Sequence, residues 1–280
     1  MKSSCPLLCP VCRRPLRKTR QSYICGKGHN FDIAKEGYVN LLLSSAQHAK
    51  MHGDNREMIR ARRDFLNKEY YRCLQKQLQK TVSSICCPRN KPVLVDAGCG
   101  EGYYTSAMYQ ALHSDLKEDN FCVYGFDMSK EALRIASKRC SQVHFAVSNL
   151  FSMPLSDNSV DLLTELFAPI ADREFYRVLK PGGILLLVIP AKKHLFELKQ
   201  ALYDTPYYNE EKVICLKGFS FMKKENVRDK IVLSCQEDIQ SLFKMTPYFY
   251  HTPVKFIRRL EMLSYLETTI DFDLFFFQKD

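Results

Sequence analysis

Three cysteines and one histidine near the amino terminus have a spacing typical of a metal site. Two residues separate Cys9 from Cys12, three separate Cys25 from His29, and twelve lie between the pairs. Three thiolates and one imidazole suit tetrahedral zinc, which prefers sulfur and nitrogen ligands. Because four protein ligands leave no position for water, the sequence predicts a structural zinc ion.

The residues around these ligands favour zinc over other uses of cysteine. The twelve residues 13–24, RRPLRKTRQSYI, can form a short hairpin that returns the second pair to the first. The alternatives are scattered free thiols or a redox CxxC pair. A redox pair normally lies at the start of a helix that follows a strand, and the segment with Pro10 and the basic residues after it does not have that pattern. Cys5 is a possible fourth ligand in place of His29, with a less suitable spacing.

A second group of residues forms a glycine-rich loop. The segment VLVDAGCGEGYYT (93–105) has the pattern of an apolar strand, a loop and a helix, and the loop contains Gly98, Gly100 and Gly102. Glycines let the backbone turn sharply and approach a ligand closely. A dehydrogenase is the competing class, but its G-x-G-x-x-G motif would need glycine at the position of Tyr103.

Acidic residues at two strand ends point to S-adenosylmethionine as the ligand of this loop. Asp96 is placed to meet the cofactor ammonium, directly or through water, and N–H groups at the helix start suit its carboxylate. Asp127, at the end of a second strand, is placed for the ribose hydroxyls, and Asn149, after a third, for the adenine edge. Ordinary strand-end turns are the alternative interpretation of all three side chains.

Strand and helix patterns alternate along the last two thirds of the chain. We expect strands at 93–97, 122–127, 143–148, 160–167, 183–190, 229–235 and 271–278. We expect helices at 105–112, 130–138, 173–179, 195–203, 236–244 and 254–265, and a helical pattern also runs from 55 to about 85. Such alternation implies an α/β fold with a mostly parallel sheet covered on both faces.

Positive charge is concentrated in the first third of the chain. The net charge is +10 over 280 residues, but residues 1–92 hold 19 Lys and Arg against 6 Asp and Glu, whereas the remainder holds 22 against 25. Phosphate contacts with a nucleic acid are expected from this clustering, and a solvated basic face is the alternative. The residues concerned are Arg13, Arg14, Arg17, Lys18, Arg20, Arg56, Arg60, Arg62 and Arg63.

Composition also bears on the cell compartment. The longest apolar run, 183–189, is far shorter than the ~20 residues of a membrane span. The first residues lack the apolar stretch of a secretory signal, and twelve cysteines without such a signal argue against a disulfide framework. We therefore expect a cytoplasmic protein without membrane contact.

Several longer motifs resemble the bacterial 23S ribosomal RNA guanine-N1 methyltransferases. Besides the zinc spacing and the glycine loop, they are HNFDIAKEGYVNLL (29–42), GDNREMIRARRDFL (53–66), FAP (167–169), AKKHLFELK (191–199) and MTPY (245–248). The resemblance implies a Rossmann-like class I methyltransferase domain with a mostly parallel seven-stranded sheet, behind a small N-terminal zinc-binding module. The expected parts are 1–42 (zinc-binding RNA recognition), 43–92 (linker and helical segment) and 93–280 (methyltransferase).

The resemblance also implies an activity and further site residues. Members transfer the methyl group of S-adenosylmethionine to N1 of one guanine in a hairpin of 23S rRNA, tend to form homodimers, and in one branch affect macrolide-type antibiotic binding. The implied zinc ligands are Cys9, Cys12, Cys25 and His29, and the implied cofactor contacts include Tyr71, Gly100, Glu101 and His194. A small-molecule methyltransferase with an accessory zinc module and a non-catalytic RNA-binding protein are the alternatives.

The segment around Phe167 lies where related enzymes hold the acceptor base. Glu165 and Asp172 flank it, but the sequence assigns no catalytic base, and a surface ion pair is the alternative role of Glu165. Tyr103 and Tyr104 are candidates for stacking on a flipped base, with core packing as the alternative.

Overall fold

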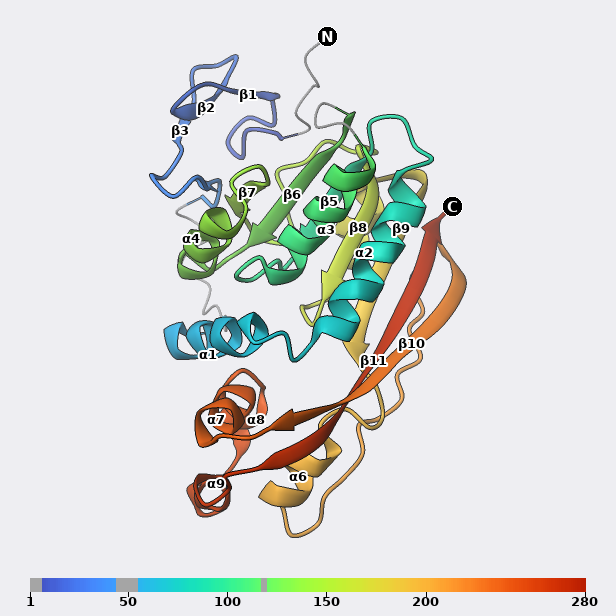
Figure 1. The fold of residues 1–280 in the computed structure, drawn as a ribbon. Helices are drawn as coiled ribbons and strands as arrows, with labels where there is room; N and C mark the ends of the chain where they lie inside the picture. The colour runs from blue at the N-terminus through green and yellow to red at the C-terminus, as the bar shows by residue number, and fades with distance from the viewer. Residues whose placement is uncertain (1–6, 44–54, 117–119) are drawn as a thin grey trace.

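An eight-stranded sheet forms the centre of the structure (Figure 1). The computed structural model describes residues 7–43, 55–116 and 120–280. Within these residues the strand order is β10-β11-β9-β8-β5-β6-β7-β4. All neighbours from β9 to β4 pair in parallel, and β11 and β10 add an antiparallel edge. The expected mostly parallel sheet is therefore confirmed.

The central strands are short and apolar, as strands buried on both faces are. They are β5 (Val93–Ala97), β6 (Cys122–Asp127), β7 (His144–Val147), β8 (Val160–Leu166) and β9 (Leu179–Pro190). Alternate side chains enter two different hydrophobic clusters, so that Leu162 packs on one side of the sheet and Leu163 on the other.

Helices cover one face of this sheet, and a helix together with the N-terminal segment covers the other. On the first face lie α2 (Arg72–Cys86), α3 (Tyr103–Asp115) and α4 (Lys130–Arg139). On the second face lies α5 (Asp172–Val178), beside Leu7, Leu16 and Tyr23 of the N-terminal segment. The doubly covered α/β sandwich predicted from the alternation is thus present.

The N-terminal segment forms a small sheet of its own and then joins the large one. Its strands are β1 (Leu16–Lys18), β2 (Ser22–Cys25) and β3 (Asn30–Asp32). The chain then adds β4 (Val39–Asn40) in parallel to β7. This strand makes the sheet eight-stranded rather than seven-stranded, and its two residues are too few to show a strand pattern in the sequence.

The helical pattern from 55 to 85 is two helices rather than one. These are α1 (Arg56–Asn67), capped by the Asn55 side chain on the Met58 amide, and α2. Between them Glu69 has a φ of 61°, a left-handed conformation that a helix cannot contain. The break lets α1 leave the sheet and pack against a C-terminal helix, while α2 covers the sheet.

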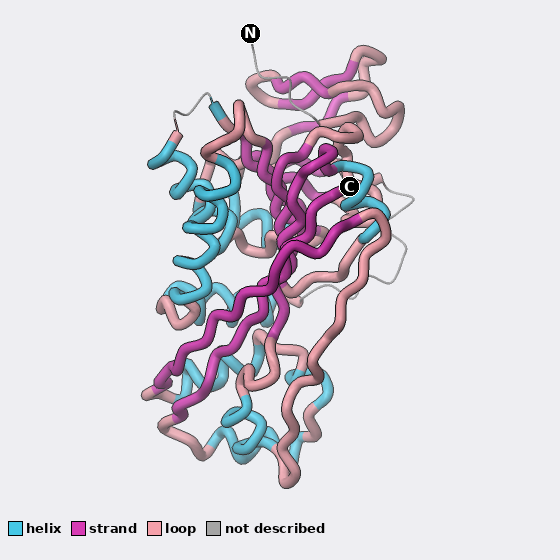
Figure 2. Tube along the Cα trace, turned by 90° about the vertical axis from the view of Figure 1, so that its right-hand side faces the viewer, coloured by secondary structure: helices cyan, strands magenta, loops and turns pink. Residues whose placement is uncertain are grey.

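The last two strands extend far beyond the sheet. They are β10 (Phe219–Leu233) and β11 (Leu266–Lys279), both longer than expected. Figure 2 shows them continuing as a twisted two-stranded ribbon toward the C-terminal helices. Those helices are α6 (Phe196–Leu202), α7 (Gln236–Lys244), α8 (Tyr248–His251) and α9 (Val254–Glu261). None of the helices described here is long and apolar enough to cross a membrane.

Candidate functional site

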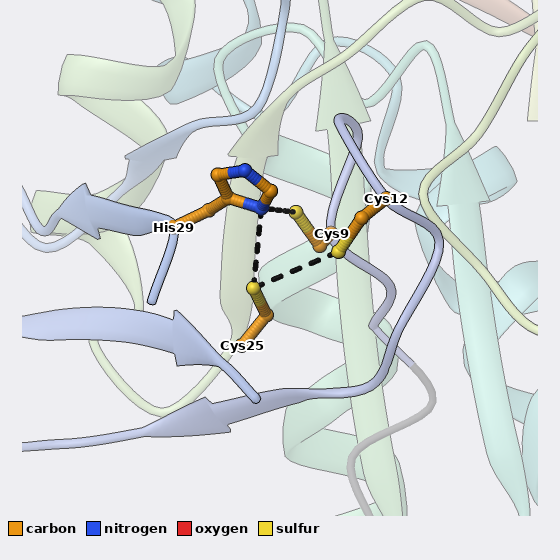
Figure 3. A group of neighbouring side chains, drawn as sticks. All are labelled: Cys9, Cys12, Cys25 and His29. Atoms are coloured by element: carbon orange, nitrogen blue, oxygen red, sulfur yellow. Dashed lines mark hydrogen bonds between the residues drawn. The ribbon is translucent and has the colours of Figure 1, made fainter. Parts of the chain in front are cut away.

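The four predicted zinc ligands lie together in the small N-terminal sheet (Figure 3). Their ligand atoms all lie within 4.8 Å of one another. The Sγ atoms of Cys12 and Cys25 are 3.7 Å apart, and Nδ1 of His29 is 3.5 Å and 3.3 Å from the Sγ atoms of Cys9 and Cys25. Zn–S bonds of ~2.3 Å give tetrahedral edges of about 3.8 Å, so this donor set fits zinc.

Two turns present the ligands. The amide of Arg13 donates to the Cys9 carbonyl, which closes the first turn, and the amide of Gly28 donates to the Cys25 carbonyl in the second. Burial raises the pKa of the Cys25 thiol, but backbone hydrogen bonds near Lys27 and His29 outweigh it and lower that pKa to about 6. A thiol that ionises this easily is a ready metal ligand. Cys5 lies outside the described residues.

The small sheet is fixed to the large one. The Leu8 amide donates to the Pro154 carbonyl at 2.8 Å, and the Tyr23 hydroxyl lies 3.3 Å from Nδ1 of His144. Arg13 donates to the carbonyls of Met153 and Leu155 at 3.3 Å and 3.4 Å. Arg13 therefore contacts the segment between β7 and β8 while remaining exposed, and the phosphate contact expected of it stays a prediction.

Two glycines of the loop, Gly98 and Gly102, are packed too tightly to accept a side chain. A Cβ at Gly98 would lie 2.6 Å from Cβ of Ala168, in the segment after β8. A Cβ at Gly102 would lie 2.8 Å from Cβ of Ala136 on α4, and Gly102 has a φ of 81°. The loop thus lies against both the second βα unit and the segment expected to hold the acceptor base.

Asp96 lies beneath the loop rather than at its surface. It is 2% exposed, and its two carboxylate oxygens accept hydrogen bonds from the hydroxyls of Thr105 and Thr164. Burial raises the pKa of Asp96 to about 6. In this arrangement Asp96 fixes the start of α3 to β5 and β8, and an ammonium group would meet it only after these hydrogen bonds rearrange.

Asp127 and Asn149 lie at the ends of the next two strands, as expected. Oδ2 of Asp127 accepts the Gly100 amide at 2.9 Å, and its Oδ1 accepts the Ser129 amide at 2.8 Å. Oδ1 of Asn149 accepts the Phe151 amide at 3.0 Å. Leu150, which follows Asn149, lies 3.7 Å from a Cβ built on Gly98. Three strand ends therefore meet around one loop, which is where doubly wound sheets bind ligands.

Glu101 is buried in an ion pair that the sequence did not reveal. It is 2% exposed, and its Oε2 pairs with the guanidinium of Arg139 at the end of α4. Its Oε1 is buried without a hydrogen-bond partner in the described structure. Burial raises the pKa of Glu101, and the charge of Arg139 opposes that rise. An orphaned buried oxygen in this loop fits a site that a polar ligand completes.

Tyr71 and His194, which are 123 residues apart in sequence, contact each other. The Tyr71 hydroxyl lies 3.4 Å from Nε2 of His194, and the Asp271 amide donates to Nδ1 of His194 at 3.2 Å. Burial lowers the pKa of His194 to about 3, so its ring is neutral and carries its proton on Nε2. The break before α2 and the turn before α6 bring these two side chains together.

Aromatic rings connect this pair to residues 167–169, the segment expected to hold the acceptor base and called the acceptor segment below. The Phe272 ring centroid lies 5.1 Å from that of Tyr71, 4.7 Å from that of His194 and 5.6 Å from that of Phe167. Phe167 is 43% exposed and has a φ of 61°. Bulky residues held in a left-handed conformation cluster at functional segments, so Phe167 is a candidate site residue.

Glu165 is not a surface ion-pair partner. It is fully buried at the end of β8, where Oε1 accepts the Ala168 amide and Oε2 has no hydrogen-bond partner in the described structure. Burial raises the pKa of Glu165 to about 8, so its carboxyl is neutral at pH 7. Tyr103, one of the two stacking candidates, is 5% exposed and packs in the core beneath the guanidinium of Arg139.

We expect the purified protein to hold one zinc ion per chain and Cys12→Ser to lose it, because three remaining ligands bind the ion far more weakly. Zinc is measured by atomic mass spectrometry after dialysis. Cys215→Ser, at an exposed cysteine outside the cluster, should retain the metal. Full zinc occupancy in Cys12→Ser would contradict this assignment of the ligands.

We also expect Glu165→Gln to change how stability depends on pH. The folded protein keeps the Glu165 proton up to a pKa of about 8, whereas the unfolded chain releases it near the ordinary pKa of 4.5. Rising pH therefore favours unfolding across this window, and glutamine removes the effect.

The measurement compares thermal unfolding of the two proteins, without cofactor, from pH 4 to 9. Relative to the wild type, the free energy of unfolding of Glu165→Gln should increase by on the order of 1–4 kcal/mol as pH rises to 8. Asp96 titrates in both proteins, and its charge is one of the causes that raise the Glu165 pKa, so the difference contains the coupling between these two groups. Parallel stability curves would show that Glu165 ionises normally.

Comparison with known proteins identifies both parts of the chain. Residues 7–50 match a zinc-ribbon family described as "RlmA, N-terminal", and residues 89–244 match a family described as "Methyltransferase domain". These matches confirm the expected zinc ribbon and the expected S-adenosylmethionine-dependent methyltransferase fold.

Relatives match over most of the chain. A protein of Micromonospora griseorubida, provisionally named a 23S rRNA (guanine-N(1)-)-methyltransferase, is 32% identical over 280 residues, which is 92% of each chain. The 23S rRNA (guanine(748)-N(1))-methyltransferase of Streptomyces fradiae is 34% identical over 197 residues, 70% of this chain and 67% of its own. A Bacillus subtilis protein, also provisionally named a 23S rRNA (guanine-N(1)-)-methyltransferase, is 28% identical over 273 residues, which is 95% of this chain and 94% of its own. The chain therefore belongs to the 23S rRNA (guanine-N1)-methyltransferase family.

Proposed function

We propose that this protein transfers the methyl group of S-adenosylmethionine to N1 of one guanine in a hairpin of 23S rRNA. The observation that carries the proposal is the match over 92% of the chain to a relative of that name, which includes both the zinc ribbon and the catalytic sheet. The contact between Gly98 and Ala168 supports it, because it places the cofactor loop directly beside the acceptor segment.

The cofactor site in this proposal consists of the residues gathered around the glycine loop. They are Tyr71, Asp96, Gly98, Gly100, Glu101, Asp127, Asn149 and His194. S-adenosylmethionine supplies a sulfonium-bound methyl group when bound there. The acidic strand ends and the orphaned oxygen of Glu101 suit its ammonium and hydroxyl groups, and the neutral ring of His194 leaves the adjacent wall uncharged.

Methyl transfer to N1 needs alignment and the loss of one proton. Neutral guanine carries a hydrogen on N1. This proton must leave for the ring nitrogen to attack the methyl carbon, in line with the bond between that carbon and sulfur. Positioning supplies much of the rate in such reactions. The exposed ring of Phe167, fixed between Tyr104 and Phe272, offers a surface against which the base can lie.

RNA contacts in this proposal involve the basic side chains that remain exposed. From the basic cluster named in the sequence these are Arg13, Arg14, Arg17, Lys18 and Arg20 on the zinc ribbon, and Arg56 and Arg60 on α1. A hairpin in contact with both groups must open locally, because duplex RNA hides the N1 edge of guanine. Ribosomal RNA as the partner also implies the cytoplasm as the place of action.

Primer extension on methylated RNA tests the activity. Undermodified 23S rRNA is incubated with the protein and labelled S-adenosylmethionine, and we expect label in the RNA and one new arrest at a guanine, because N1-methylation blocks Watson–Crick pairing. Unmodified RNA incubated without the cofactor is the control.

The alternatives give different outcomes in the same assay. A small-molecule methyltransferase would bind the cofactor and leave the RNA unlabelled. A non-catalytic RNA-binding protein would bind RNA and no cofactor. Either result would refute the proposed reaction.

We further propose a division of the chain into residues 1–42 for RNA recognition, 43–92 for linker and helices, and 93–280 for catalysis. The charge difference between the first 92 residues and the remainder supports the division.

We also propose that the protein is a homodimer. The expected result of sedimentation equilibrium is twice the mass of one chain at micromolar concentration. The mass of a single chain under these conditions would contradict the dimer.

A further inference from the structure

Most amides of the glycine loop already have acceptors within the protein. Four loop amides already donate within the protein: Gly98 and Cys99 to the Phe126 carbonyl, Gly100 to Asp127, and Gly102 to the Cys99 carbonyl. The carboxyl groups of Asp96, Glu101 and Asp127 also lie at this loop. A carboxylate brought here meets the amides at the start of α3 but also several acidic groups, so a cation beside the loop would favour its binding.

Two arginines lie at the loop, and both already make contacts within the protein. Arg139 pairs with Glu101 and also donates to Oδ1 of Asn67. Arg62 comes from α1, and its Nη1 is 3.9 Å from the position that a Cβ would take on Gly100. Its other terminal nitrogen donates to the Met245 carbonyl at 3.4 Å, a long hydrogen bond.

The helix places Arg62 on its packed side rather than toward solvent. Met58, Phe65 and Leu66 are buried, and residues three and four apart share one helix face, so Arg62 lies among them. Arg62 is half-buried, whereas Arg56 and Arg60 on the same helix are exposed. The sequence pattern of α1 thus separates one arginine from the outward basic residues.

Two ion pairs join the ends of α1 to α7. Nζ of Lys68 lies 2.5 Å from Oδ1 of Asp238, and Nζ of Lys244 lies 2.8 Å from Oε1 of Glu57. Figure 1 shows α1 between the parallel sheet and α7. The guanidinium is therefore carried by an element that is anchored at both ends.

The charge of Arg62 acts on both parts of the candidate cofactor site. Burial raises the pKa of Tyr71 and of Glu101, and Arg62 opposes the rise at both groups. Arg62 is therefore a cation within electrostatic reach of both the loop and the aromatic pair.

We propose that Arg62 binds the carboxylate of the methionine part of S-adenosylmethionine above Gly100. The proposal rests on the cofactor site proposed above. It gives Arg62 a role in cofactor binding instead of the phosphate contact expected from its place in a basic cluster. A guanidinium can hold a carboxylate through two parallel hydrogen bonds, which fixes the orientation of the cofactor as well as its affinity.

Calorimetric titration with two cofactor analogues tests this role. S-adenosylhomocysteine contains the amino-acid carboxylate, whereas 5′-methylthioadenosine lacks the whole amino-acid part. Arg62→Ala should weaken binding of S-adenosylhomocysteine about 10–100-fold, the effect of losing a hydrogen bond to a charged group, and leave 5′-methylthioadenosine binding unchanged. Arg62→Lys should have a smaller effect, because it keeps the charge but loses the paired hydrogen bonds.

Arg60→Ala is the matched control, since it removes the same charge from the exposed side of α1 and should leave both affinities unchanged. Equal losses for both analogues in Arg62→Ala would mean that Arg62 only supports the fold, and would overturn the proposal. Unchanged S-adenosylhomocysteine binding with weaker RNA binding would overturn it in favour of a phosphate contact. Failure of the wild type to bind S-adenosylhomocysteine would instead refute the proposed cofactor site itself.

Discussion

The arrangement of the whole site depends on the absence of two side chains. Gly98 and Gly102 let the loop after β5 lie directly against Ala168 and Ala136, at distances where a Cβ would clash. Because these alanines belong to the segment after β8 and to α4, the contacts hold the β5 loop, the acceptor segment and the Asp127 strand end in one place. Asp96 and its two hydroxyl donors then fix the loop from below.

The second half of the site comes from distant parts of the chain. Tyr71 stands at the break between α1 and α2, His194 follows β9, and Phe272 belongs to the long strand β11. Their rings pack together only because α1 turns away from the sheet at Glu69 and the β10–β11 ribbon extends past its edge. Tertiary packing, rather than local sequence preference, creates this wall.

The sequence predicted the features that depend on local spacing, and missed those that depend on packing. The zinc ligands, the hairpin between them, the glycine loop and the alternation of strands and helices all have short-range patterns, and the structure contains them. The break near Glu69 lies within a continuous apolar periodicity, so no residue type marks it. The buried state of Glu165, the Glu101–Arg139 ion pair and the inward position of Arg62 each need a neighbour from a remote segment, which spacing alone cannot reveal.

The two-residue strand β4 gives the zinc ribbon a role in protecting the catalytic sheet. It covers β7, which would otherwise be an open edge with unpaired backbone groups, the kind of edge that recruits strands from other chains. The ribbon and β4 are joined by only six residues, 33–38. A chain that lost its zinc would loosen this cover as well as the basic surface proposed to contact RNA. Zinc binding would then also protect the large sheet against pairing of this edge with strands of other chains.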